Sequence, residues 1–102
     1  MTWVPHSCTL PTAEQPLRVA EFDDLFATAV TGAARPAPER LTLRLEPTPS
    51  VAAAAADLVV RETGCCSFFT FALTAAGGEL TLDVTVDAAH VAVLDAIARR
   101  AS

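Results

Sequence analysis

The sequence predicts one α+β domain in which helices and strands follow the order α-β-α-β-β-α. Apolar and polar residues alternate with a period of two, as in half-buried strands, at 41–45 and 80–86, and a third predicted strand, 66–73, is rich in Phe. Apolar residues recur at helical spacing in three other stretches: 17–31, 51–63 and 88–100. A chain of 102 residues holds one hydrophobic core and has no room for a second. We therefore expect residues 1–102 to form a single domain.

The N-terminal third is expected to contain an extended arm and one helix. The arm covers residues 1–12. Thr12 and Gln15 fit a capping box at the start of a helix within 13–32. The apolar residues near one face of this helix are Val19, Phe22, Leu25, Phe26, Ala29 and Val30. Residues 33–39 are rich in proline and are predicted to be a connector to the rest of the domain.

The remaining residues, 40–101, are expected to form a βαββα core. Ser50 is a suitable N-cap for the middle helix, and Gly64 is a suitable C-terminal stop for it. Asp87 is a suitable N-cap for the last helix. Each predicted helix is therefore bounded by residues that favour a helix end.

The three predicted strands fit one small sheet. The pair Gly77-Gly78 between the last two strands favours a two-residue hairpin turn. The first two strands are linked through a helix, and this link must be a right-handed crossover. The third strand then lies between the other two and antiparallel to both. The predicted fold is a three-stranded ferredoxin-like (split βαβ) sheet with helices on one face. The other face is either hydrated or covered by a partner. It carries Thr42, Arg44, Thr81, Asp83 and Thr85.

Charge and composition narrow the class of partner. Seven basic residues, all of them Arg, stand against 12 acidic ones, for a net charge of −5. Nucleic acids and anionic membranes require a basic face, so neither is expected as a partner. No stretch approaches the roughly 18 apolar residues of a membrane span, and the N-terminus lacks the basic and apolar regions of a signal peptide. We expect a cytoplasmic protein, and its Arg- and Ala-rich composition is typical of a GC-rich bacterium.

The three cysteines, Cys8, Cys65 and Cys66, are the most informative residues. An odd number argues against a secreted disulfide framework. In a reducing cytosol, thiols are more often buried, metal-binding or catalytic. A stable disulfide between the neighbours Cys65 and Cys66 is not expected, because its geometry is strained. Two interpretations stay open for this pair: small buried hydrophobes at a helix–strand junction, or functional thiols.

Glu62 continues the apolar stripe of the helix that precedes the cysteine pair. The stripe consists of Val51, Ala55, Leu58 and Val59. A carboxylate in apolar surroundings must be paired, protonated or bound to another group. We expect Glu62 to be largely buried and hydrogen-bonded, with the arm or a thiol as the donor. The alternative is that Glu62 reaches water at the helix end.

The arm supplies a third thiol and an imidazole if it lies over the cysteine pair. It carries Cys8 and His6, and its apolar residues Trp3 and Val4 are suited to docking. Thiolates select soft ions such as Hg(II), Zn(II), Cd(II), Cu(I) or As(III). The spacing is not that of a zinc finger, which needs a C-x-x-C pair. The negative end of a helix disfavours a thiolate, and we expect Arg61 to offset this effect. The candidate metal ligands are Cys8, Cys65, Cys66, Glu62 and His6.

The motif Glu-x-x-Cys-Cys-x-Phe-x-x-Phe runs from Glu62 to Phe71 and is followed by a glycine hairpin and an alternating strand. In these features the chain resembles a group of small, mostly uncharacterised bacterial proteins that are associated with resistance to heavy metals such as mercury or arsenic. The resemblance covers about residues 41–100 and only weakly the arm. Ser67 departs from the group, where Pro or Ala is common. The resemblance implies that the Glu and both Cys of the motif are important.

Three functions remain open. The first is binding of a thiophilic metal or metalloid ion, or another small molecule, without catalysis. The second is a thiol-dependent enzyme, redox or organometal-cleaving, with Cys65 or Cys66 as the nucleophile and Glu62 or His6 as the proton carrier. The third is a non-catalytic interaction module, including a homodimer, that pairs through a sheet edge or the polar face. His90, in the first turn of the last helix, is expected at the surface and outside the site.

Overall fold

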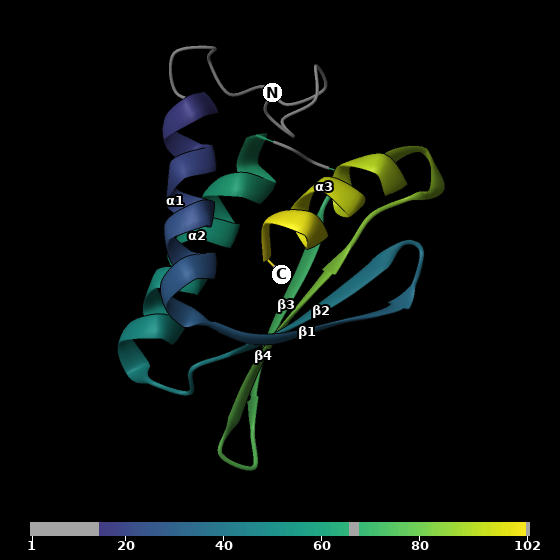
Figure 1. Ribbon diagram of the computed structural model, residues 1–102. Coiled ribbons are helices and arrows are strands. Elements are labelled where there is room, and N and C mark those ends of the chain that lie inside the picture. Colours follow the sequence, from purple (N-terminus) through teal and green to yellow (C-terminus); the bar gives the residue numbers. More distant parts are fainter. Residues whose placement is uncertain (1–14, 66–67, 102) are drawn as a thin grey trace.

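The computed structural model describes residues 15–65 and 68–101, with side chains from residue 20 onward except that of Cys65 (Figure 1). The predicted arm, the capping residue Thr12, and Cys66 lie outside the described residues. The elements are α1 (Gln15–Ala29), β1 (Val30–Ala37), β2 (Arg40–Leu45), α2 (Pro49–Cys65), β3 (Thr70–Ala76), β4 (Glu79–Thr85), the 3₁₀ helix η1 (Ala88–His90) and α3 (Val91–Ala101).

The sheet has four strands in the order β1-β2-β4-β3, and every neighbouring pair is antiparallel. The predicted three-stranded ferredoxin-like topology is therefore wrong, although the α+β class is confirmed. The arrangement predicted for the three expected strands does occur, because β4 lies between β2 and β3 and is antiparallel to both. The difference is one additional strand, β1, at the edge beside β2.

β1 occupies most of the segment 33–39, which the sequence predicts to be a connector. α1 ends at Ala29 rather than at residue 32, so Gly32 belongs to β1. β1 pairs with β2 along most of its length, with register shifts near both ends. Pro36 is tolerated because an outer strand needs only half of its N–H groups for pairing, and irregular register relaxes the requirement further. A proline-rich segment is thus compatible with an edge strand.

The helices cover one face of the sheet, and the core lies between the two layers (Figure 1). Along β2 every second residue is buried, which confirms the predicted alternation. α1 buries the predicted apolar face at Phe22, Leu25, Phe26 and Ala29. The buried residues of the strands that meet the helices are Leu41, Leu43, Leu45, Leu80, Leu82 and Val84.

The opposite face of the sheet is polar, as predicted. Asp83 lies at its centre and accepts a hydrogen bond of 2.6 Å from Thr42 Oγ1. Arg40 Nη2 donates to the same Asp83 oxygen over 3.1 Å. The neighbouring Arg44 and Thr85 are exposed. These contacts satisfy the central carboxylate within the face itself.

α2 is longer than the sequence predicts at both ends. It begins at Pro49, and Thr48 Oγ1, not Ser50, accepts the hydrogen bond of the Val51 N–H at 3.2 Å. Gly64 does not end the helix, which continues to Cys65. The reason is that Gly64 does not adopt the positive φ of a helix C-cap.

The β3–β4 hairpin turns at Gly77 and Gly78, as predicted. Their φ angles are 59° and 78°, both in the region that glycine adopts without strain. This is the backbone of a type I′ turn, which matches the twist of a two-residue hairpin. β3 begins at Thr70, later than the predicted start at residue 66.

None of the helices in the described part of the chain is both long and apolar enough to cross a membrane.

Candidate functional site

Glu62 is buried at the C-terminal end of α2, with 1% of its surface exposed. It continues a buried stripe formed by Ala55, Leu58 and Val59, so the predicted burial is confirmed. Glu62 is not without an interaction partner there. An isolated carboxylate in such a place would be strongly disfavoured. Glu62 therefore places an ionisable side chain inside the core at this end of α2.

His90 lies against the chain segment that follows the cysteine pair. Its imidazole stacks on Phe68, with ring centroids 4.1 Å apart and an angle of 6° between the planes. Its Nδ1 is 2.5 Å from Asp87 Oδ1. The side chain is 24% exposed, so His90 lies at the surface, as predicted, but is partly covered. Phe68 shields one face of the ring, and Asp87 fixes its rotation.

Asp87 is the N-cap residue of η1, but its side chain forms no capping hydrogen bond. The predicted cap is therefore absent, and the carboxylate binds the imidazole of His90 instead. The His90 N–H closes the turn on the backbone oxygen of Asp87 at 3.0 Å. A carboxylate on Nδ1 leaves Nε2 as the nitrogen that is free to accept a proton or a metal ion.

Two further phenylalanines anchor the segment between α2 and β3. Phe69 is buried, and its ring centroid lies 4.5 Å from that of Phe68. On its other side, Phe71 lies 5.2 Å away between centroids. Tilted aromatic pairs at these distances are favourable beyond the apolar area that they bury. The three phenylalanines of the motif thus hold the chain in place as it enters β3.

Arg61, the predicted counter-charge for a thiolate, is already paired with two carboxylates. Its guanidinium donates to Glu21 at 2.9 Å and to Asp57 at 2.8 Å. Hydrogen bonds to Glu21 and then to Asp57 raise the pKa of Arg61 above its ordinary value. The pair with Glu21 joins α2 to α1, and the two carboxylates compensate the charge of Arg61.

α1 and α2 run antiparallel, so the N-terminal end of α1 lies at the same end of the molecule as the C-terminal end of α2 (Figure 1). The Arg61–Glu21 pair connects the two helices at this end. The arm joins the described chain at Gln15. Cys8 is seven residues before Gln15, and seven extended residues reach about 25 Å. The arm is therefore attached on the side of the molecule where Glu62 is buried.

The predicted ligands fall into two groups. Glu62 is placed, and Cys65 is the last residue of α2. The side chain of Cys65, and all of His6, Cys8 and Cys66, lie outside the described residues. Among the side chains that are described, no three His, Cys, Asp or Glu residues come close enough together to hold a metal ion.

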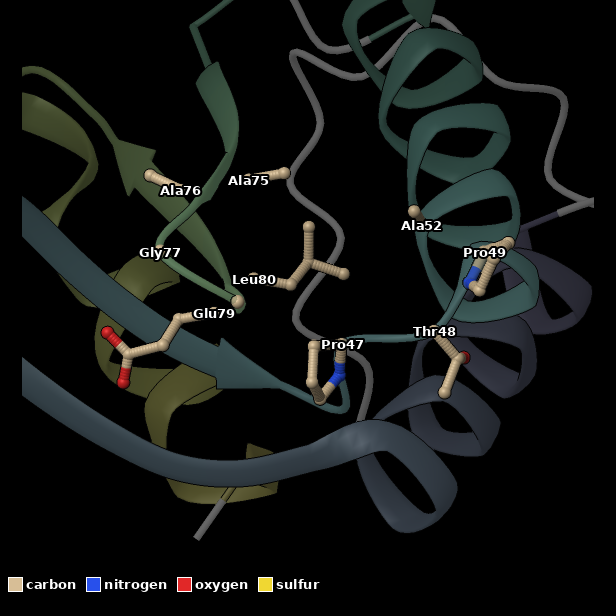
Figure 2. A pocket seen from close by; sticks show the side chains of 10 residues that line it. Pro47, Thr48, Pro49, Ala52, Ala75, Ala76, Gly77, Glu79 and Leu80 are labelled. Atoms are coloured by element: carbon tan, nitrogen blue, oxygen red, sulfur yellow. The ribbon is translucent and has the colours of Figure 1, made fainter.

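A surface hollow lies at the end of α2 opposite to Glu62 (Figure 2). It is an open hollow of about 420 Å³, lined by the start of α2 and the β3–β4 hairpin. Leu80 points into it, whereas the Glu79 carboxylate points away (Figure 2). Thirteen residues of helix, about 20 Å, separate Pro49 from Glu62. Its lining offers no thiol or imidazole, so it does not share the chemistry of the Glu62 end.

No family model, curated protein or solved structure matches this chain. The candidate site is therefore assigned from its own residues. The sequence analysis named His90 and Asp87 separately and did not predict that they pair. Their spacing, with a carboxylate at the helix cap and an imidazole three residues later, is the signal that would have paired them.

Proposed function

We propose that the protein binds a thiophilic metal or metalloid ion at the C-terminal end of α2. The thiolates of Cys65 and Cys66 are the central ligands, Glu62 supports them, and the arm contributes Cys8 and His6. Sulfur ligands of this kind favour Hg(II), Cd(II), Zn(II), Cu(I) or As(III). The burial of Glu62 is the observation that carries the proposal.

A buried carboxylate is costly unless it does something that an apolar residue cannot do. Glu62 occupies a core position of α2, where leucine would pack without that cost. Cys65 follows it by three positions in the same helix. Positions three apart are neighbours on a helix surface. The buried carboxylate of Glu62 and the first cysteine of the pair, Cys65, are thus neighbours on the surface of α2.

The position of the arm's attachment supports a contribution from Cys8. Because α1 begins beside the end of α2, the arm needs only to fold back over a short distance to reach the cysteine pair. A chain that entered at the other end of α1 would have to cross the length of the helix pair. The antiparallel packing therefore favours a three-thiol site.

The electrostatics of the helix end favour a bound cation over a free thiolate. The last turn of α2 contains no basic residue, and Arg61 is occupied by Glu21 and Asp57. The negative end of the helix dipole raises the cost of a free thiolate. A bound soft ion removes this cost, because it deprotonates its thiol ligands and compensates their charge.

Calorimetry and thermal denaturation with Hg(II) and with As(III), on the reduced chain, test the proposal. Binding to the folded state alone stabilises by about 2.7 kcal/mol at a hundredfold excess over Kd. In a domain of this size, each kcal/mol raises Tm by roughly 4–8 °C. The double variant Cys65→Ser/Cys66→Ser should lose most of the shift, and Cys8→Ser should lose part of it.

Unfolded cysteines also bind such ions, so the comparison between variants decides the matter, not the shift of the wild type alone. Native mass spectrometry should show one ion per folded wild-type chain and none on the double variant. Equal shifts in the wild type and the double variant would remove the proposed site.

A thiol-dependent enzyme is the second candidate, and the Asp87–His90 pair favours it. An imidazole held by a carboxylate on Nδ1 is suited to carry a proton to or from a nearby thiol. Its partner Phe68 is two residues after Cys66 in the chain. In this case His90→Asn should slow alkylation of the Cys65–Cys66 pair by iodoacetamide at neutral pH about tenfold. If His90 does not activate a thiol, the variant will react like the wild type.

A further inference from the structure

We infer that β3 is a self-association edge: it pairs with β3 of a second copy around a two-fold axis and extends the sheet across two chains. This inference is independent of the proposed ion binding, because it uses no cysteine. It joins the four strands of each copy into one continuous sheet. The helices of both copies then lie on the same side of that sheet.

β3 is an outer strand with the composition of an unprotected edge. Its seven residues, Thr70–Ala76, have the sequence TFALTAA and contain neither a charge nor a proline. Natural sheets usually protect their outer strands with charges, prolines or bulges. The opposite edge, β1, has this protection, because it contains Arg35 and Pro36 and two register shifts. The contrast singles out β3 as the edge suited to pairing.

The hairpin geometry determines which backbone groups β3 offers. In a two-residue type I′ turn the residues that flank the turn, here Ala76 and Glu79, exchange hydrogen bonds. Hydrogen-bonded and non-hydrogen-bonded pairs alternate along an antiparallel ladder. Phe71, Leu73 and Ala75 therefore direct their N–H and C=O groups away from β4. No described backbone group outside the strand ladder bonds to them.

These three residues match themselves under a two-fold axis. When Leu73 lies opposite Leu73 of the second copy, Phe71 lies opposite Ala75 of that copy, and all outward groups are paired. In this register the largest side chain of the edge faces the smallest. Phe71 and Leu73 are only partly buried in the single chain, so pairing covers apolar surface that is otherwise exposed. This self-complementarity favours a second copy over an unrelated strand.

α2 supplies a second contact on the same flank. α2 packs over β3, and Val60 of α2 is an exposed large hydrophobic residue, with 68% of its surface accessible. The next residue, Arg61, faces α1 through its bond to Glu21. Successive residues are about 100° apart around a helix, and the preceding residue, Val59, is buried in the core, so Val60 faces neither the core nor α1. In the two-fold arrangement the two α2 helices run antiparallel beside each other, and this flank is the one that they share.

Sedimentation equilibrium on the full chain tests the inference. The wild type should have twice its monomer mass of 10.7 kDa. Val60→Glu changes an exposed side chain only and should return the mass to that of a monomer. Ala75→Pro removes one outward N–H that β4 does not use and should have the same effect. Ala92→Glu, at an exposed position of α3, is the control and should stay dimeric.

Hydrogen exchange gives a residue-level measurement. In the wild type, the amides of Phe71, Leu73 and Ala75 should exchange at least about tenfold more slowly than in Val60→Glu, because pairing protects them. A wild type that stays monomeric up to about 1 mM, where even a dimer with a Kd of about 1 mM would show, overturns the inference. A dimer that both variants leave intact overturns it as well, because its interface would then lie elsewhere.

Discussion

The ring of Phe68 lies flat against the imidazole of His90, 4.1 Å away between centroids. This contact joins the segment after the cysteine pair to the start of the last helical segment. Asp87 holds the imidazole at its edge through Nδ1. The contact therefore connects the end of α2 to a histidine that lies far away in the sequence.

We expect Phe68→Leu to free the His90 ring. Removing the stacked ring eliminates its ring-current effect, so the His90 carbon-bound protons should move downfield in NMR spectra. The loss of the ring pairs should also destabilise the fold by about 0.5–1.5 kcal/mol beyond the lost apolar area, measured by urea denaturation. Phe71→Leu is the matched control: it should cost stability and leave the His90 resonances unchanged. Unchanged resonances in Phe68→Leu would contradict the stacking.

We expect Glu62→Leu to uncouple stability from ion binding. An apolar residue of similar volume removes the cost of a buried carboxylate, so the free energy of unfolding should stay constant or increase. Affinity for Hg(II) should nevertheless decrease by about 10–100-fold, as for other groups that support metal ligands. Urea denaturation and competition titrations measure the two effects. A variant that binds as tightly as the wild type would show that Glu62 is structural.

Two glycine-to-alanine variants should have opposite effects on stability. Gly64 lies inside α2, and a Cβ there would meet no other atom within 4 Å, so Gly64→Ala should stabilise the fold by about 0.4–1 kcal/mol. Gly78 has a φ of 78°, so Gly78→Ala should destabilise it by about 1 kcal/mol or more. Chemical denaturation measures both. A destabilising Gly64→Ala would show that α2 does not continue through this residue.

We expect Arg61→Ala to have a small, salt-dependent effect. The variant loses the bonds to Glu21 and Asp57, and partly exposed pairs of this kind contribute about 0–1 kcal/mol. The difference in unfolding free energy from the wild type should shrink in 1 M salt, where charges are screened within about 3 Å. Binding of Hg(II) should not change, because this charge is already compensated. Weaker binding would restore Arg61 as the counter-charge of the thiolates.

The strands with a regular alternation could be predicted from the sequence, and the one without it could not. The leucines of β2 are spaced two apart, and the structure buries all of them. β1 has no such pattern, because most of its residues are small or polar and none of them is fully buried. Its Pro36 and Gly32 favour a loop, and only pairing with β2 overrides this preference.

The candidate site was predictable where it depends on one helix and not where it depends on contacts between distant segments. The burial of Glu62 follows from its place on the apolar stripe of α2. The position of His90 depends on the path of the chain between α2 and β3, which brings Phe68 to it. Gly64 misled the prediction of the helix end, because glycine also occurs inside helices when its φ stays negative.

The irregular outer strand β1 determines how far assembly can proceed. A sheet with two regular edges can add copies at both, and such addition continues into a fibre. With its register shifts and Pro36, β1 resists strand addition. If β3 joins two copies, each copy has used its one regular edge. The two outer edges of the joined sheet are then the irregular β1 strands. The assembly is then a closed, two-fold symmetric pair that cannot grow into a polymer.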